Sequence, residues 1–99
     1  MQDSIPAGHV LDLPSEPTLS DGTAGAVEPG SITLPLCQDV LDLTETVSES
    51  EIALAMKHIY TEFGMVVEGS AGVAVASFIK SKQIYKNQNV VIILCGKNI

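Results

Sequence analysis

Residues 67–72, Val67-Glu68-Gly69-Ser70-Ala71-Gly72, open a run of small and apolar residues that indicates a buried helix. Ser70 is placed to cap this helix, which we expect to run from residue 71 to about residue 83. A continuous apolar stretch, residues 89–94, follows and ends at Cys95 and Gly96. Such a stretch is typical of a strand covered on both faces of a parallel sheet. Because ligands of these sheets bind beyond the carboxyl ends of the strands, Cys95 marks a candidate site.

The patterns before this stretch predict further alternation of helix and strand. Apolar residues recur at helical spacing over residues 32–41. Ser48 and Glu51 form a capping box, and Gly64 is a candidate left-handed cap where that helix ends. Short strands are expected over residues 43–47 and 65–67. The sequence therefore predicts an α/β fold, a layered and partly parallel sheet with flanking helices.

The N-terminal third has a different composition. Residues 1–31 hold four of the five prolines, and residues 10–13 could form one short strand before Pro14 stops it. Residues 15–30 are expected to be a long ordered loop, which in a compact domain is functional or lies against a partner. We predict a loop-rich segment 1–31 and an α/β segment 32–99 within a single domain 1–99.

Charge and hydropathy exclude several function classes. The formal net charge is −7, all five lysines lie at or after Lys57, and arginine is absent, so nucleic-acid binding is not expected. The apolar runs are shorter than a membrane span needs, and the start does not resemble a signal peptide. Cys37 and Cys95 show no metal-ligand spacing and are expected to be free thiols in the cytoplasm.

Three motifs together resemble one enzyme family. Residues 18–22, Thr-Leu-Ser-Asp-Gly, are similar to its Thr-[Leu/Ile]-Ala-Asp-Gly segment, and residues 67–72 to its Glu-Pro-[Ser/Thr]-[Gly/Ala] helix start. Residues 91–98 are similar to its terminal Leu-[Ser/Cys]-Gly-Gly-Asn. The family is that of the pyridoxal-phosphate-dependent threonine/serine dehydratases and serine racemases, which have the fold type II, tryptophan-synthase-β-like architecture. The motifs keep family order and cover most of the chain.

The resemblance implies a set of cofactor-binding residues. The position of Gly22 packs on one face of the cofactor ring in the family, that of Glu68 lies near the ring, and that of Cys95 faces the pyridine nitrogen. Ser70 and Gly96 would also line the pyridoxal phosphate, and none of these residues is the catalytic base.

Each position also has a plainer interpretation. Gly22 after Asp21 is an ordinary turn pair, Glu68 can simply complement a helix dipole, and Cys95 can be a small buried apolar residue. His9 and His58 have no partner in the sequence pattern, so neither is expected to be a ligand, and no metal site is predicted.

The resemblance also implies which parts of the site lie elsewhere. The Schiff-base lysine and the phosphate cradle belong to the N-terminal part of the family, and Lys97 replaces its second terminal glycine. We therefore expect the C-terminal segment of a dehydratase-like lyase that acts on hydroxy-amino acids, inactive alone and associating as a homo-oligomer, such as a dimer. The alternative is a free-standing α/β interaction or regulatory module without catalysis.

Overall fold

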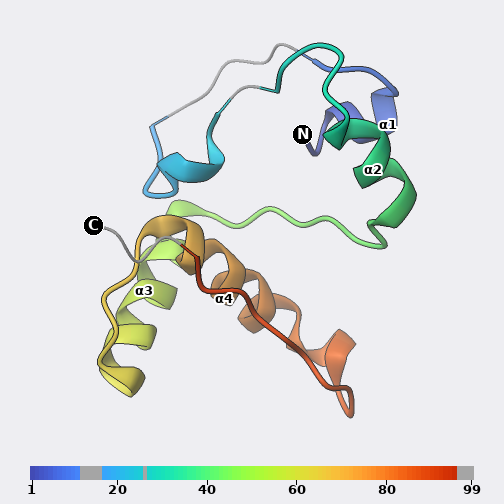
Figure 1. Ribbon diagram of the computed structural model, residues 1–99. Coiled ribbons are helices and arrows are strands. Elements are labelled where there is room, and N and C mark those ends of the chain that lie inside the picture. Colours follow the sequence, from blue (N-terminus) through green and yellow to red (C-terminus); the bar gives the residue numbers. More distant parts are fainter. Residues whose placement is uncertain (12–16, 26, 96–99) are drawn as a thin grey trace. The chain divides into compact units, whose positions relative to one another are not determined.

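The computed structural model describes residues 1–11, 17–25 and 27–95 and is helical (Figure 1). The described elements are, in chain order, α1 (Ser4–Ala7), the 3-10 helix η1 (Asp21–Thr23), α2 (Thr33–Val40), α3 (Glu49–Phe63), α4 (Gly69–Ser81) and the 3-10 helix η2 (Lys82–Tyr85). They fall into two compact units. Unit 1 comprises residues 1–16 and 25–45, and unit 2 comprises residues 17–24 and 46–99. The predicted boundary after residue 31 stays a prediction.

Unit 1 is built on α1 and α2, which lie side by side in Figure 1. The Gln38 side-chain amide of α2 donates to the Ile5 carbonyl of α1 at 3.1 Å. The buried Ser4 hydroxyl accepts the Leu11 backbone N–H at 2.9 Å, which closes the chain after α1. The helix predicted over residues 32–41 is confirmed as α2, in which Leu34 is the buried side chain.

Helix α3 of unit 2 begins and ends at the residues that the sequence predicts. The Ser48 hydroxyl accepts the Glu51 N–H at 3.2 Å, and the Glu51 carboxylate accepts the Ser48 N–H at 2.8 Å, so the capping box is formed. Gly64 ends the helix with a left-handed φ of 66°, a conformation that glycine adopts without a Cβ penalty. Of the apolar side chains of α3, Ile52 and Ile59 are buried, whereas Phe63 is 69 % exposed.

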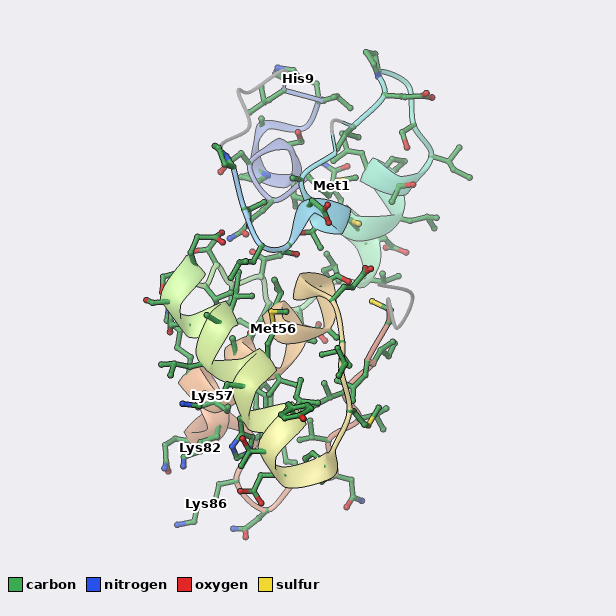
Figure 2. All side chains as sticks on the ribbon, turned by 90° about the vertical axis from the view of Figure 1, so that its left-hand side faces the viewer. Met1, His9, Met56, Lys57, Lys82 and Lys86 are labelled. Carbon is green, nitrogen blue, oxygen red and sulfur yellow. The ribbon has the colours of Figure 1, made fainter. Side chains whose placement is uncertain are left out.

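The core of unit 2 lies where α3 packs against α4. Ile59 of α3 contacts Val67 and Ala71, all three with at most 4 % of their surface exposed. A Cβ on Gly72 of α4 would stand 2.8 Å from Met56 Cγ, so the absence of a side chain there brings the two helices close together. Figure 2 shows Met56 between the ribbons of α3 and α4. The buried helix predicted from this run of small residues therefore packs closely against α3.

The start of α4 differs from the prediction. The helix begins at Gly69, and the residue at the cap position is Glu68, with an extended backbone and no side-chain capping bond. Ser70 lies inside the first turn and its hydroxyl donates to Glu68 Oε1 at 2.6 Å. The prediction of Ser70 as the cap was wrong because the helix begins at Gly69, one residue before it, so Ser70 already lies inside the first turn. At the other end, α4 gives way to η2 at Lys82.

The predicted sheet is wrong for the described residues, none of which forms a strand. Residues 43–47, 65–67 and 89–94 are irregular, as are residues 10 and 11, while residues 12 and 13 lie outside the described part. The physical reason is that a parallel strand exists only through ladder bonds to a neighbour. Within the described ranges these segments are not bonded laterally to one another, so the apolar pattern alone does not produce a sheet.

The terminal segment, residues 90–95, retains a strand-like alternation of its side chains. It runs back along α4 in Figure 1 and borders a hollow formed with Ala74, Ser77 and Phe78. Val91 is 90 % and Ile93 74 % exposed, whereas Ile92 between them is half-buried. This period of two places one face of the segment toward α4 and leaves the other uncovered. Full burial on both faces, as predicted, is not observed.

No helix within residues 1–11, 17–25 and 27–95 combines the length and apolar character that crossing a bilayer requires.

Candidate functional site

Three segments of unit 2 meet at the start of α4. A hydrogen-bonded series of side chains joins two of them: Cys95 Sγ donates to Ser70 Oγ at 3.8 Å, and Ser70 Oγ donates to Glu68 Oε1 at 2.6 Å. Glu68 and Ser70 are half-buried and Cys95 is exposed. The thiol at the end of the terminal segment is therefore linked through one hydroxyl to a carboxylate.

The third segment brings the backbone of Gly22 to the same place. Gly22 belongs to η1, and a Cβ built on it would lie 3.3 Å from Glu68 Oε1 and 3.8 Å from Ser70 Cβ. Any side chain at this position would crowd the Glu68–Ser70 pair. The glycine thus leaves a bare backbone surface beside a carboxylate, a hydroxyl and a thiol, which is the kind of surface a flat ring can approach.

Gly69 explains how the η1 loop comes so close to α4. A Cβ on Gly69 would stand 2.0 Å from the Leu19 carbonyl oxygen and 2.7 Å from the Ser20 nitrogen, which no real side chain tolerates. The first residue of α4 therefore has to be glycine for the Leu19–Ser20 peptide to lie against it. Gly69 is buried as a result of this contact.

Glu49, in the first turn of α3, holds the same loop from another helix. Its carboxylate accepts the Leu19 N–H at 2.8 Å through Oε2 and the Thr18 hydroxyl through Oε1. These hydrogen bonds stabilise the charged form, the Leu19 N–H most strongly, and hold the pKa of the Glu49 carboxyl below its usual value. Helices α3 and α4 thus both contribute to the position of the loop that carries Gly22.

The lysines of unit 2 serve other purposes. Lys80 Nζ donates to the Thr46 carbonyl at 3.0 Å and lies 3.6 Å from Glu51 Oε1. Figure 2 shows Lys57, Lys82 and Lys86 as extended side chains, and all three are exposed. Among the described residues, none of the groups of histidine, cysteine and acidic side chains could hold a metal ion. The candidate site is therefore built from backbone, hydroxyl, thiol and carboxylate groups.

Four of the five residues predicted from the sequence are brought together. Gly22, Glu68, Ser70 and Cys95 meet at the start of α4, and Gly96 lies outside the described residues. Their roles as cofactor ligands stay predictions. Sequence reasoning assigned no role to Gly69, although it lies inside a quoted motif. It also missed Glu49, because a contact between residues 30 positions apart leaves no local signal.

Known proteins match this chain over almost its whole length. The family of pyridoxal-phosphate dependent enzymes matches residues 1–96. An L-threonine ammonia-lyase of Geobacter sulfurreducens is 32% identical over 97% of this chain and 24% of its own length. Threonine dehydratase 2 biosynthetic, chloroplastic, of Solanum lycopersicum is 34% identical over 97% of this chain and 16% of its own length. A crystal structure of serine racemase from Dictyostelium discoideum superposes with a TM-score of 0.81 and 27% identity, over 98% of this chain and 31% of that one.

The chain therefore belongs to the family of pyridoxal-phosphate dependent enzymes. It spans 16–30% of the length of the curated relatives named threonine dehydratase or L-threonine ammonia-lyase. The resemblance read from the three motifs is confirmed.

The residues present fit one side of such a cofactor. Gly22, which is exposed, presents backbone without a side chain next to the Glu68–Ser70 pair, and the thiol and the hydroxyl there can hydrogen-bond to a ring nitrogen. Within the described residues, neither a lysine nor a glycine-rich cradle of backbone amides joins them. The described residues therefore include groups suited to bordering a ring, and none of the described residues at this place is suited to anchoring it.

Proposed function

We propose that this chain forms one wall of the pyridoxal phosphate site in a threonine/serine dehydratase-like lyase. The reaction is the deaminating β-elimination of a hydroxy-amino acid. The Cα–H and Cβ–O bonds break with loss of water, and one water then hydrolyses the unsaturated amino acid product, which breaks the Cα–N bond and gives a 2-oxo acid and ammonia. The observation that carries the proposal is the meeting of Gly22, Glu68, Ser70 and Cys95 from three separate segments. The names of the relatives, threonine dehydratase and L-threonine ammonia-lyase, support the choice of reaction.

Each of the four residues has a part that follows from its chemistry. Pyridoxal phosphate supplies an electron sink when it is bound. The Gly22 backbone offers a surface without a side chain for the ring face, and Cys95 can donate a weak hydrogen bond to the ring nitrogen. Ser70 hydrogen-bonds to both the Cys95 thiol and the Glu68 carboxylate and therefore fixes their positions relative to each other.

The base that removes the α-proton is not among these residues. Lys80 is engaged with Glu51 and Thr46, and the exposed lysines Lys57, Lys82 and Lys86 are not among the partners of the site. In the proposed enzyme, a lysine of the family's N-terminal part, which this chain does not resemble, performs the proton transfer, as the resemblance implies. The chain contributes the groups around the ring nitrogen. These groups determine how well the ring stabilises the negative charge that develops when the α-proton is removed.

The proposal is tested by changing the partner of the ring nitrogen. In the cofactor-loaded enzyme that contains this chain, Cys95→Ser keeps a donor of similar size, whereas Cys95→Asp adds a negative charge that favours a protonated nitrogen. We expect the aspartate to slow oxo-acid formation relative to exchange of the α-proton with solvent deuterium, and the serine to change this ratio little. L-threonine and L-serine are the substrates to compare.

Two results would contradict the assignment of Cys95. If the serine variant alters the ratio as much as the aspartate variant does, the effect comes from packing. If neither variant alters the ratio, Cys95 is not near the ring nitrogen. Absence of oxo-acid formation in the unmodified enzyme with either substrate would exclude the proposed reaction itself.

A further inference from the structure

The turn that carries Gly22 is closed by its own hydrogen bonds. The Thr23 N–H and the Thr23 hydroxyl both donate to the Ser20 carbonyl, at 3.0 Å and 2.9 Å. Since the only hydroxyl proton of Thr23 is used there, the 2.6 Å contact between Ser20 Oγ and Thr23 Oγ1 must have Ser20 as its donor. Ser20 is 2% exposed. Residues 20–23 therefore form a small rigid unit, and the position of Gly22 depends on how that unit is held.

Thr18 connects this turn to α3. Its hydroxyl donates to Glu49 Oε1 and accepts the Ser20 N–H at 3.1 Å. The second carboxylate oxygen of Glu49 accepts the Leu19 N–H at 2.8 Å. The Glu49 carboxylate thus holds the loop at Thr18 and Leu19. The Thr18 hydroxyl in turn accepts the N–H of Ser20, the first residue of the turn.

Gly69 of α4 contacts the same loop at Leu19. The Leu19 carbonyl lies so close to Gly69 that a Cβ there would stand 2.0 Å from the oxygen. The Leu19 N–H is therefore hydrogen-bonded to Glu49, and the Leu19 carbonyl packs against Gly69 of α4. Because Leu19 contacts both α3 and α4, the direction in which the chain continues into the residue 20–23 turn is fixed.

We propose that Glu49 is a positioning residue that aims the Gly22 backbone at the Glu68–Ser70 pair through Thr18 and the residue 20–23 turn. The consequence for a cofactor rests on the proposed function, because only there does Gly22 border a ring. Glu49 itself belongs to α3 and holds residues 18 and 19, so it acts through the loop and not on the reacting atoms. The inference assigns a task to a carboxylate that the three family motifs do not include.

The charge of Glu49 gives the restraint a pH dependence. Hydrogen bonds from Leu19 and Thr18 lower its pKa, so the fully charged acceptor persists above that pKa and is lost as the pH falls through it. Other titrating groups lie near. Asp21 is in the turn, Glu68 faces Gly22, and Glu51, beside Lys80, shares the first turn of α3. A test must therefore separate Glu49 from these groups.

The first test follows the backbone amides of Leu19 and Gly22 by nuclear magnetic resonance between pH 6 and pH 2.5. In the unmodified chain, we expect the Gly22 amide to shift with the same acid midpoint as the Leu19 amide. In Glu49→Gln this shared component should vanish. Glu51→Gln is the matched control, because it removes an equal charge from the same helical turn and glutamine still completes a capping box.

A Gly22 titration that is the same in the unmodified chain and in Glu49→Gln would overturn the proposal, as would loss of the shared component in Glu51→Gln. Retained protection of the amides of Ile59 and Ala76 shows that a variant keeps the α3–α4 core.

The second test removes the link instead of the charge. Thr18→Val deletes the hydroxyl that joins Glu49 to Ser20, and Thr18→Ser retains it. We expect hydrogen exchange of the Ser20 amide at pH 6 to accelerate roughly threefold to tenfold in the valine variant. The serine variant should exchange like the unmodified chain. Equal exchange in the valine variant and the unmodified chain would contradict transmission through Thr18.

These tests need no cofactor, so their failure would leave the proposed cofactor wall standing. Conversely, a negative result with the Cys95 variants would leave Glu49 as the residue that orients the loop. The two claims can therefore fail separately.

Discussion

Gly69 shows how much a single residue without a side chain determines in this chain. The Leu19 carbonyl occupies the space that a Cβ on Gly69 would need, so the approach of the η1 loop to α4 depends on this glycine. The Gly22 backbone follows from that approach, and with it the composition of the candidate site. Gly25 is a contrasting case, since a Cβ there would meet nothing within 4 Å.

Replacing Gly69 with alanine should therefore be costly and replacing Gly25 should not. In Gly69→Ala, the loop must move to relieve an overlap with backbone atoms, and we expect the free energy of unfolding to fall by about 1–3 kcal/mol. Gly25→Ala should leave it nearly unchanged. Urea denaturation of the two variants measures the difference, and equal midpoints would show that the loop does not lie on Gly69.

At the level of single residues, the sequence predicted which residues form the candidate site better than it predicted what each of them does. The predicted site does come together at Gly22, Glu68, Ser70 and Cys95. The resemblance to the family motifs carries information on tertiary contacts, which secondary-structure propensity does not. Ser70 as a helix cap was wrong, since a serine at a helix start can bond to the backbone or to a neighbouring carboxylate, and the pattern is the same in both cases. Glu49 could not be recognised, because its partners are 30 and 31 positions away.

Among the elements, the start of α3 performs two tasks with two carboxylates. Glu51 completes the capping box and pairs with Lys80, and Glu49 holds the loop. Backbone N–H groups are the main cause of the lowered pKa in both, from Ser48 for Glu51 and from Leu19 for Glu49. A lowered pKa in the folded chain means that ionisation stabilises the fold above the pKa of the unfolded chain.

Stability should therefore decrease in acid. As the pH falls below the unfolded value of about 4.3, the stabilisation from Glu49 and Glu51 should fade, and it should be gone once the pH has passed the lowered pKa values. We expect urea midpoints to drop between pH 6 and pH 3, and to drop less in the double variant Glu49→Gln, Glu51→Gln. A double variant with the same pH dependence as the unmodified chain would contradict these assignments.

The elements that the sequence predicted correctly are those set by local interactions. Helix α3 is delimited by a capping box and a left-handed glycine, each of which involves neighbouring residues only. The strands over residues 43–47, 65–67 and 89–94 depend on distant partners, and a pattern of apolar residues cannot state whether those partners are within reach. Val91, Ile92 and Ile93 still alternate between exposed and half-buried positions, as the residues of a strand do. Within the described residues they form no strand.

On the scale of the whole molecule, several large apolar side chains of the described residues are exposed. Val91 and Ile93 expose 90 % and 74 % of their surfaces, and Ile32 exposes 77 %. A homo-oligomer would cover side chains of this kind if they form a contiguous patch. Association of the chain as a homo-oligomer stays a prediction. The match to about a third or less of each relative agrees with a chain that provides one wall of a site.

The central claim, that this wall borders the cofactor, is tested most directly by the reactivity of Cys95. Cys95 is exposed and Cys37 is half-buried in the other unit, so Cys37 serves as the internal control. Alkylation of each thiol with iodoacetamide should be timed by mass spectrometry in the enzyme that contains this chain, with pyridoxal phosphate bound and after its removal. We expect bound cofactor to slow the reaction of Cys95 severalfold and to leave that of Cys37 unchanged. Equal rates for Cys95 in the two states would contradict the claim.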